Sequence, residues 1–118
     1  MSTSITFCGG TRTVTGSMHL IESDGERVVI DCGLFQGHRE EFYQVNSHFC
    51  FNHFQIDSLV LSHSHIDHCG NLPNLVKSGF SGKIFVTKPT KELCQLMLLD
   101  SARIQEEDIK FVNKINLR

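Results

Sequence analysis

Four side chains of the kinds that bind metal ions lie within six residues of this 118-residue chain. Leu59–Pro73 reads LVLSHSHIDHCGNLP, and the four side chains are those of His63, His65, Asp67 and His68. Imidazole nitrogens together with a carboxylate oxygen suit zinc, and manganese or iron where oxygen ligands dominate. A solvated histidine-rich loop is the alternative, but four potential ligands directly after an apolar run favour a metal site.

The spacing of these residues predicts how they share metal ions. Side chains two residues apart on an extended chain project to the same side, so His63 and His65 would converge on one ion. Asp67 and His68 would then turn toward a second ion. Two neighbouring ions lower the pKa of a shared water and hold the attacking and leaving oxygens of a phosphodiester or acyl group. The motif therefore predicts a hydrolytic site.

The strands expected around the motif indicate an α/β fold. Apolar and β-branched residues predict strands at 3–8, 17–22, 27–31, 56–62 and 82–87. Asp24-Gly25 is a typical turn between the second and third of them. Leu59, Val60 and Leu61 are apolar on consecutive positions, which predicts a strand covered on both faces. The metal-binding motif follows the C-terminal end of that strand, where α/β units place their ligands.

The helices are predicted from capping residues and apolar spacing. A short helix is expected at 39–46, inside a long loop. Asn71 is a candidate N-cap of a helix that ends near Gly79, which makes a β-loop-α-β unit with its flanking strands. Thr90 is a candidate N-cap of a last helix, whose apolar stripe would pack against the sheet. That stripe consists of Leu93, Leu96 and Met97.

Composition indicates one globular domain without a basic surface. Hydrophobic residues make up 40% of the chain, and the net charge of -2 provides no positive field, so a polyanion would have to be held locally or by another region. The five cysteines are far apart and form no CxxC pair, which predicts reduced thiols, no disulfide and a cytoplasmic location. No apolar run approaches the roughly 20 residues of a membrane span, so we expect no membrane association.

The motif HSHIDH is the HxHxDH signature, and at this point the sequence resembles the metallo-β-lactamase superfamily. Further stretches are similar, in content and order, to the β-CASP branch of RNA-processing nucleases. They are FCGGTRTVTGSMHLIE, VVIDCGLFQG, LSHSHIDHCGNLPNLV and SARIQEED. This branch matches better than the glyoxalase-like hydrolases or the transfer-RNA 3′-processing enzymes. The resemblance covers nearly the whole chain.

The resemblance implies a role for each matching residue. His63 and His65 would bind one zinc ion, and Asp67 and His68 would bind the second and also take part in catalysis. Asp31 matches an aspartate that ends a strand and holds the metal loop by hydrogen bonds rather than by binding metal. The alternative for Asp31 is an ordinary turn residue at a strand end. The implied reaction is hydrolysis of RNA phosphodiester bonds through a metal-activated hydroxide.

The sequence departs from the family after His68. No further histidine follows, whereas the family completes its two-metal site with a later histidine, a bridging aspartate and a final histidine. The family fold is a four-layer αββα sandwich of two similar halves. Residues 1–118 correspond to the N-terminal part of the first half, a mixed β-sheet with flanking helices, without the inserted β-CASP domain. We therefore expect an incomplete domain whose catalysis needs a C-terminal region.

Two other hypotheses stay open. The chain could serve as a non-catalytic metal-binding or scaffold module that associates with itself or with a complementing chain. An exposed sheet edge and an uncovered apolar face would then promote association. The third hypothesis keeps the enzyme and changes the substrate from RNA to another ester or a thioester.

Overall fold

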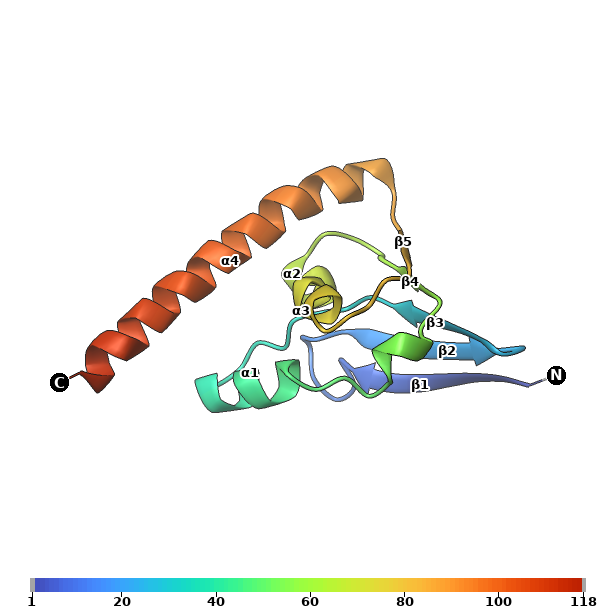
Figure 1. Cartoon of the computed structure of the whole chain (residues 1–118), viewed down its shortest axis with the longest axis horizontal. Coiled ribbons are helices and arrows are strands. Elements are labelled where there is room, and N and C mark those ends of the chain that lie inside the picture. The colour runs from blue at the N-terminus through green and yellow to red at the C-terminus, as the bar shows by residue number, and fades with distance from the viewer. Residues whose placement is uncertain (1, 118) are drawn as a thin grey trace.

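Five strands form one mixed sheet in the computed structural model, which describes residues 2–117. The strands are β1 (Thr3–Gly9), β2 (Met18–Ser23), β3 (Glu26–Ile30), β4 (Ser58–Val60) and β5 (Lys83–Phe85). They lie in the spatial order β1-β2-β3-β4-β5 (Figure 1). The pairs β1–β2 and β2–β3 are antiparallel, and the pairs β3–β4 and β4–β5 are parallel. The predicted mixed sheet is confirmed.

Helices lie between and after the parallel strands. They are α1 (Arg39–Asn46), α2 (Ile66–Cys69), α3 (Leu72–Lys77) and α4 (Lys88–Asn116), with a 3-10 turn η1 (His53–Gln55). The range predicted for α1 is confirmed, and α3 with β4 and β5 makes the expected unit. Helix α2 was not predicted, because its four residues lie within the metal-binding motif and are too few to show helical periodicity.

The turn between β2 and β3 is the one that its residues predict. Asp24 and Gly25 both have positive φ, 52° and 80°, and Ser23 pairs directly with Glu26. Two left-handed residues suit the right-handed twist of a tight hairpin, and Asp and Gly adopt that conformation more readily than most residues. The hairpin fixes the register of β3, whose end leads to Asp31.

One face of the sheet packs on the helices. Leu20, Val29 and Leu59 occupy one row across β2, β3 and β4, and each is 5% exposed or less. They belong to one core cluster with Leu75 of α3 and Phe80. Full burial of such a side chain contributes roughly 1.5–3 kcal/mol, so this layer supplies much of the stability of the fold.

The opposite face of the sheet is not covered within residues 2–117. Its members Ile5, Phe7, Val60 and Phe85, called here the open sheet face, are 40–66% exposed. Phe7, Val60 and Phe85 lie on one row that crosses the sheet through His19. The prediction that β4 is covered on both faces is wrong, because the helices pack on the side of Leu59 only.

Helix α4 starts earlier than predicted and leaves the sheet. Its N-cap is Thr87, whose side-chain oxygen accepts a hydrogen bond from the backbone N–H of Thr90 (3.4 Å). The prediction that its apolar stripe packs on the sheet is wrong, since Leu93 and Leu96 are 51% and 69% exposed. The helix contacts α2 near its start and then extends away from the rest of the fold (Figure 1). Cys94, near that start, is part of the core cluster. Among the described residues, no helix is long and apolar enough to span a membrane.

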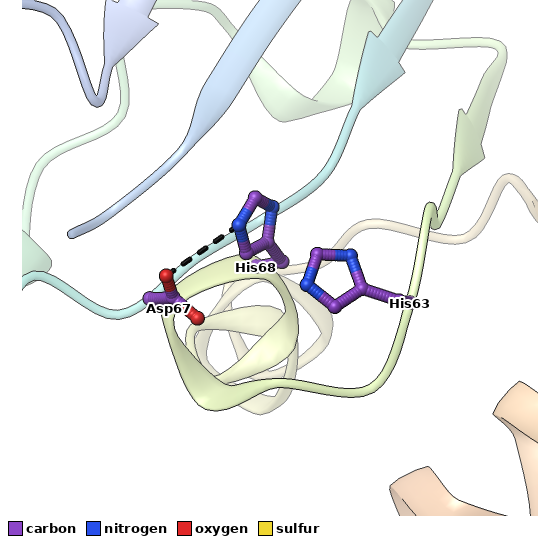
Figure 2. A group of neighbouring side chains, drawn as sticks. All are labelled: His63, Asp67 and His68. Carbon is purple, nitrogen blue, oxygen red and sulfur yellow. Dashed lines mark ion pairs between the residues drawn. The ribbon is translucent and has the colours of Figure 1, made fainter. Parts of the chain in front are cut away.

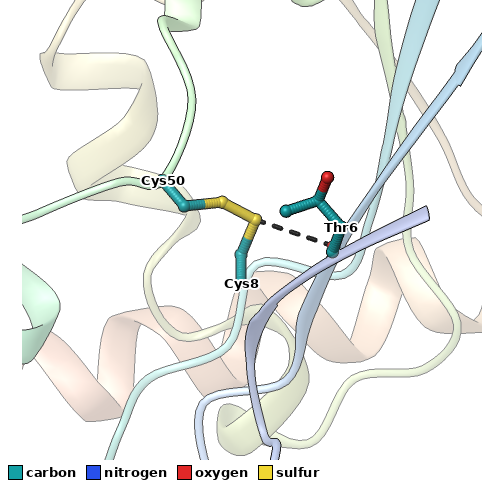
Figure 3. Close-up of a disulfide and its surroundings, with 3 residues drawn as sticks. All are labelled: Thr6, Cys8 and Cys50. Atoms are coloured by element: carbon teal, nitrogen blue, oxygen red, sulfur yellow. Dashed lines mark hydrogen bonds between the residues drawn. A yellow bond between two sulfur atoms is a disulfide. The ribbon is translucent and has the colours of Figure 1, made fainter. Parts of the chain in front are cut away.

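A disulfide joins Cys8 and Cys50, which corrects the prediction that all the cysteines are reduced (Figure 3). The two residues are 42 positions apart in the sequence and their Cα atoms are 5.6 Å apart, a usual separation for a disulfide. Sequence spacing could not reveal the pair, because the fold brings the end of β1 beside the segment between α1 and η1. The buried free cysteines are Cys32, Cys69 and Cys94.

Candidate metal centre

Three of the four predicted ligands form a cluster after the end of β4. Potential ligand atoms of His63, Asp67 and His68 all lie within 4.8 Å of one another (Figure 2). His63 lies in the segment between β4 and α2, and the other two are on α2. All three side chains are partly buried, which leaves the cluster open to solvent on one side. Two imidazoles and one carboxylate are a donor set that fits zinc.

His65 is not a member of this three-residue cluster, although its ring lies next to that of His63. It is the exposed N-cap of α2, and its ring centroid is 4.9 Å from that of His63. A helix begins directly after His65, so Asp67 and His68 lie on the single turn of α2 and their side chains group with His63. The pairing of His63 with His65 on one ion stays a prediction.

Asp31 lies beneath the cluster at the end of β3. It is 4% exposed and has a left-handed φ of 63°, a conformation that aspartate adopts more readily than most residues. Its carboxylate accepts hydrogen bonds from the Ser62 N–H (2.7 Å), the Ser62 hydroxyl (2.7 Å) and His68 Nδ1 (2.8 Å). The backbone turn therefore aims a buried acceptor at the residues that carry the metal motif.

The contact with Asp31 fixes the orientation of the His68 ring. A carboxylate can only accept a hydrogen bond, so His68 Nδ1 must donate. In the neutral ring the other nitrogen, Nε2, then has a free lone pair, and it lies 3.5 Å from Asp67 Oδ2. A carboxylate that holds the far nitrogen of a ligating histidine is the usual arrangement around protein-bound zinc. The geometry is the one that the predicted role of Asp31 requires.

Backbone hydrogen bonds fix the position of α2. The pairs are Leu34 N to Ile66 O (3.0 Å), Ser17 N to Asp67 O (3.0 Å) and Cys32 N to His68 O (2.9 Å). Gly33 lies between these donors, and a Cβ atom added there would collide with the Asp67 carbonyl group. Only glycine allows this approach. The chain that follows β3 therefore supports the turn that carries two of the potential ligands.

Two buried asparagines connect the segment after β3 with α1 and α3 through hydrogen bonds. The Asn46 side chain accepts from Phe35 N (2.8 Å) and donates to Phe35 O (2.9 Å). Asn71 is the N-cap of α3 as predicted, but its side chain donates to the backbone carbonyl of Asn46 (3.0 Å) instead of capping the helix. Neither contact has a recognisable sequence signal, because asparagine also occurs in ordinary turns.

The buried thiols near the cluster are poor ligands. Desolvation, with a smaller contribution from Cys94, raises the pKa of Cys69 to about 12, and its thiol donates to Ser64 O (3.2 Å). Desolvation also raises the pKa of Cys32. Metal ions bind thiolates, so neutral buried thiols favour a packing role. Cys69 accordingly lies in the core cluster.

The clustered side chains are partly exposed and lie outside the cavity that the neighbouring helices form. A cavity of about 540 Å³ lies between α1, α2 and α4, with Phe42, Met97 and Ile104 among its lining residues. Arg39 and Asp108 form an ion pair beside it (2.6 Å). None of the three clustered residues lines this cavity. The histidines at positions 19, 38, 48 and 53 lie outside the cluster.

The chain belongs to the metallo-β-lactamase superfamily, whose family model matches residues 11–103. It is also similar in fold to a metallo-β-lactamase of Cronobacter sakazakii described by a HARLDQ motif, with 20% identity and a TM-score of 0.50. That likeness covers 68% of this chain and 28% of the other. The fold class expected from the sequence is confirmed.

The curated relatives of the chain belong to the β-CASP branch. The chain is 38% identical over 99 residues to Ribonuclease TTHA0252 of Thermus thermophilus, which covers 84% of this chain and 22% of that protein. It is 32% identical over 111 residues to Transcription termination factor FttA of Methanocaldococcus jannaschii, covering 92% and 17% respectively. The branch predicted from the sequence is confirmed. The chain spans about a fifth of the length of these relatives.

Proposed function

We propose that this chain is the N-terminal part of a metal-dependent hydrolase domain that cleaves phosphodiester bonds in RNA. The observation that carries the proposal is the arrangement around Asp31, which holds His68 with one nitrogen directed at Asp67. Similarity to a protein named ribonuclease supports RNA as the substrate. The net charge of -2 implies that contacts outside this chain hold most of the RNA.

The proposed metal is zinc, with two ions in the complete site and manganese or iron as alternatives. His63, Asp67 and His68 are proposed to hold metal within this chain, and His65 joins them through its exposed ring. When bound, the metal supplies a Lewis acid and lowers the pKa of a coordinated water. Asp67, whose side chain is 27% exposed, is the proposed acceptor for a proton of the attacking water, and His68 is held in place by Asp31.

We propose that residues 1–118 form only the first part of the domain. The open sheet face supports this view, because Phe7, Val60 and Phe85 form an exposed apolar row that a second layer would bury. The chain also spans only 22% and 17% of the length of two curated relatives, which supports the same proposal. The second layer would come from a further segment of the same protein, with a complementing chain or a second copy as alternatives.

Metal content tests the proposal. The chain is purified without added metal, and bound zinc is measured by mass spectrometry for the wild type, for His63→Ala/His65→Ala and for His48→Ala as a matched control outside the cluster. We expect zinc in the wild type and the control and its loss in the double variant. Equal zinc in all three proteins would overturn the proposed site.

Activity tests the proposed substrate. The product of the complete reading frame is loaded with zinc and incubated with end-labelled single-stranded RNA. We expect cleavage by the wild type and loss of cleavage by at least a hundredfold in the double variant, since removal of two ligands removes the metal-activated water. A zinc-loaded protein that leaves RNA intact but hydrolyses an ester or thioester would overturn the choice of substrate.

We propose a cytoplasmic location, which the three buried free thiols support. The disulfide between Cys8 and Cys50 weighs in the other direction, because most structural disulfides form in oxidising compartments. Alkylation of free thiols at the moment of cell lysis, followed by mass spectrometry, tests the location. In a reducing compartment we expect Cys8 and Cys50 to be alkylated completely, so that the disulfide of the structure forms only after the protein meets an oxidant. A fully oxidised pair at the moment of lysis would contradict the proposed location.

A further inference from the structure

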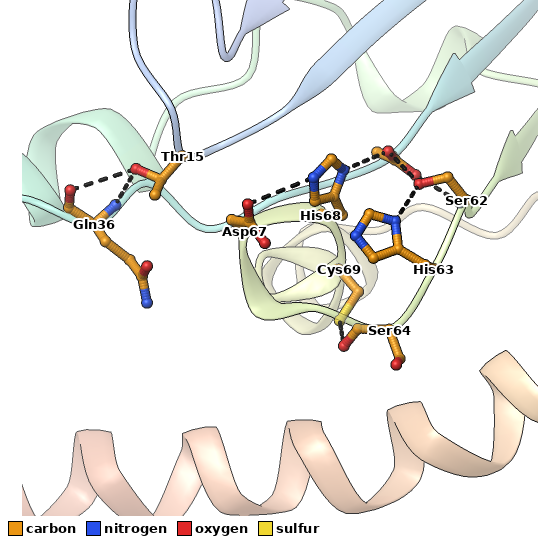
Figure 4. A network of polar contacts seen from close by, with 9 residues as sticks. Thr15, Gln36, Ser62, His63, Ser64, Asp67, His68 and Cys69 are labelled. Carbon is orange, nitrogen blue, oxygen red and sulfur yellow. Dashed lines mark hydrogen bonds and ion pairs between the residues drawn. The ribbon is translucent and has the colours of Figure 1, made fainter.

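Ser62 is the residue between β4 and the first histidine of the motif, and it contacts both Asp31 and His63. Its N–H and its hydroxyl donate to the two oxygens of Asp31, each over 2.7 Å. Its hydroxyl oxygen also lies 2.9 Å from His63 Nδ1 (Figure 4). Ser62 is itself exposed, but both of its donors point toward a buried carboxylate.

The directions of these hydrogen bonds follow from the number of protons. A hydroxyl carries one proton, and Asp31 can only accept, so the Ser62 proton lies toward the carboxylate. The remaining contact, between Ser62 Oγ and His63 Nδ1, is then a hydrogen bond only if the imidazole donates. The neutral form of His63 therefore carries its proton on Nδ1 and has a free lone pair on Nε2.

We infer that Ser62 is a positioning residue that extends the effect of the Asp31 carboxylate to His63, so that one carboxylate fixes the tautomers of two metal-binding imidazoles. Asp31 acts on His68 directly and on His63 through the hydroxyl. Both rings then present Nε2 as the nitrogen available to a cation. This inference rests on the proposed function, because it assigns a role in metal binding to these two rings.

The rings of His63 and His68 lie close together, as expected if the Asp31 carboxylate orients both of them. The ring centroids of His63 and His68 lie 4.0 Å apart at an interplanar angle of 48°. Asp67 completes the group on the side of His68 Nε2. Loss of the Ser62 hydroxyl would leave His68 under the control of Asp31, while His63 would lose the acceptor for its Nδ1 proton. The two histidines should therefore respond differently to the same substitution.

The first test measures the tautomers without metal. Long-range ¹H–¹⁵N NMR spectra of the metal-free protein at about pH 8, where imidazoles are ordinarily neutral, report which ring nitrogen carries the proton. The variants are Ser62→Ala, Ser62→Thr, which keeps the hydroxyl, and Ser64→Ala as the control from the same loop. We expect His63 to be protonated on Nδ1 in the wild type, Ser62→Thr and Ser64→Ala, and to become a mixture of tautomers in Ser62→Ala.

His68 is the internal reference of this experiment. It should keep its proton on Nδ1 in all four proteins, which also shows that each variant retains the folded arrangement around Asp31. An unchanged His63 tautomer in Ser62→Ala would overturn the inference. A His63 tautomer that changes equally in Ser62→Thr would overturn it too, since the effect would then come from packing and not from the hydroxyl.

The second test measures zinc affinity by competition with a chelating dye. Partners that orient a ligating histidine typically contribute 10–100-fold in metal affinity. We expect Ser62→Ala to bind zinc about tenfold more weakly or worse, and Ser62→Thr and Ser64→Ala to remain within about threefold of the wild type. No zinc binding by the wild type would overturn the proposed function, whereas the tautomers of the metal-free protein decide the role of Ser62 independently.

Discussion

Asp31→Asn tests most directly whether the buried carboxylate prepares the metal ligands. Asparagine has the same shape and also tolerates the left-handed φ of 63° at this position, so the backbone need not move. The amide keeps one accepting oxygen, but its other end donates. Since His68 Nδ1 donates to the carboxylate in the wild type, the amide would favour the opposite tautomer, with the proton on Nε2.

The expected loss of stability in Asp31→Asn follows from the three hydrogen bonds that Asp31 accepts. Hydrogen bonds to a charged group contribute about 1.5–3 kcal/mol each and neutral ones about 0.5–1.5 kcal/mol, so each bond weakens by about 1 kcal/mol. His68 is 26% exposed and water replaces part of its loss, so we expect a decrease of about 2 kcal/mol in the free energy of unfolding. The tautomer change should weaken zinc binding about 10- to 100-fold.

Urea denaturation followed by circular dichroism, with a chelator present, gives the free energy of unfolding. Competition with a chelating dye gives the zinc affinity. The control is Asp57→Asn, because Asp57 also accepts a hydrogen bond from a backbone N–H, that of Arg27 (2.7 Å), but lies away from the cluster. We expect the control to lose less than about 1 kcal/mol and no zinc affinity. A folded Asp31→Asn protein that binds zinc within about threefold of the wild type would refute the role of Asp31.

Three further predictions concern the support of the site and the cysteines. Gly33→Ala should lose zinc binding and destabilise the fold by about 3 kcal/mol, because its Cβ would collide with the carbonyl group of Asp67. The control Gly25→Ala, where a Cβ meets no atom, should cost only about 1 kcal/mol. Equal urea midpoints for the two variants would contradict the role of Gly33. Cys8→Ser opens a loop that spans 42 positions and should lower the free energy of unfolding by about 4 kcal/mol without reductant, and unchanged midpoints would count against the disulfide. Burial raises the pKa of Cys69 from 9.0 to about 12, so the thiol loses its proton at lower pH in the unfolded chain than in the folded one. The stabilisation that the buried neutral thiol contributes should be complete below pH 9 and lost as the pH rises from 9 to 12. The melting temperature should therefore fall more steeply over this range in the wild type than in Cys69→Ala.

Sequence reasoning succeeded where local physical chemistry decides the structure. The turn at Asp24-Gly25, helix α1 and the position of the metal motif after β4 all follow from turn residues, spacing and apolar runs. The errors have one cause in common, which is that they depend on what packs against a segment. Val60 and Leu96 are apolar at positions typical of buried residues, yet they are 40% and 69% exposed.

The site was predictable in residue type but not in arrangement. The HxHxDH spacing located the potential ligands, whereas the helical turn of α2, which groups Asp67 and His68 with His63, could not be inferred from the spacing. Ser62 and Gly33 are common residue types, and their roles appear only when distances to Asp31 and Asp67 are known. The disulfide was missed for the same reason, since sequence separation gives no information about Cα separation.

The support of α2 by distant backbone has a consequence for folding. Its terminal carbonyls are held by Ser17, Cys32 and Leu34, which lie more than 30 residues away along the chain. The motif is therefore not an autonomous unit, and an isolated peptide of residues 59–73 would lack these donors as well as the Asp31 carboxylate. Because loop-closure entropy must be overcome before such contacts form, an ordered metal site should emerge together with the pairing of β3 and β4, late in folding. Metal affinity can thus report on completion of the fold.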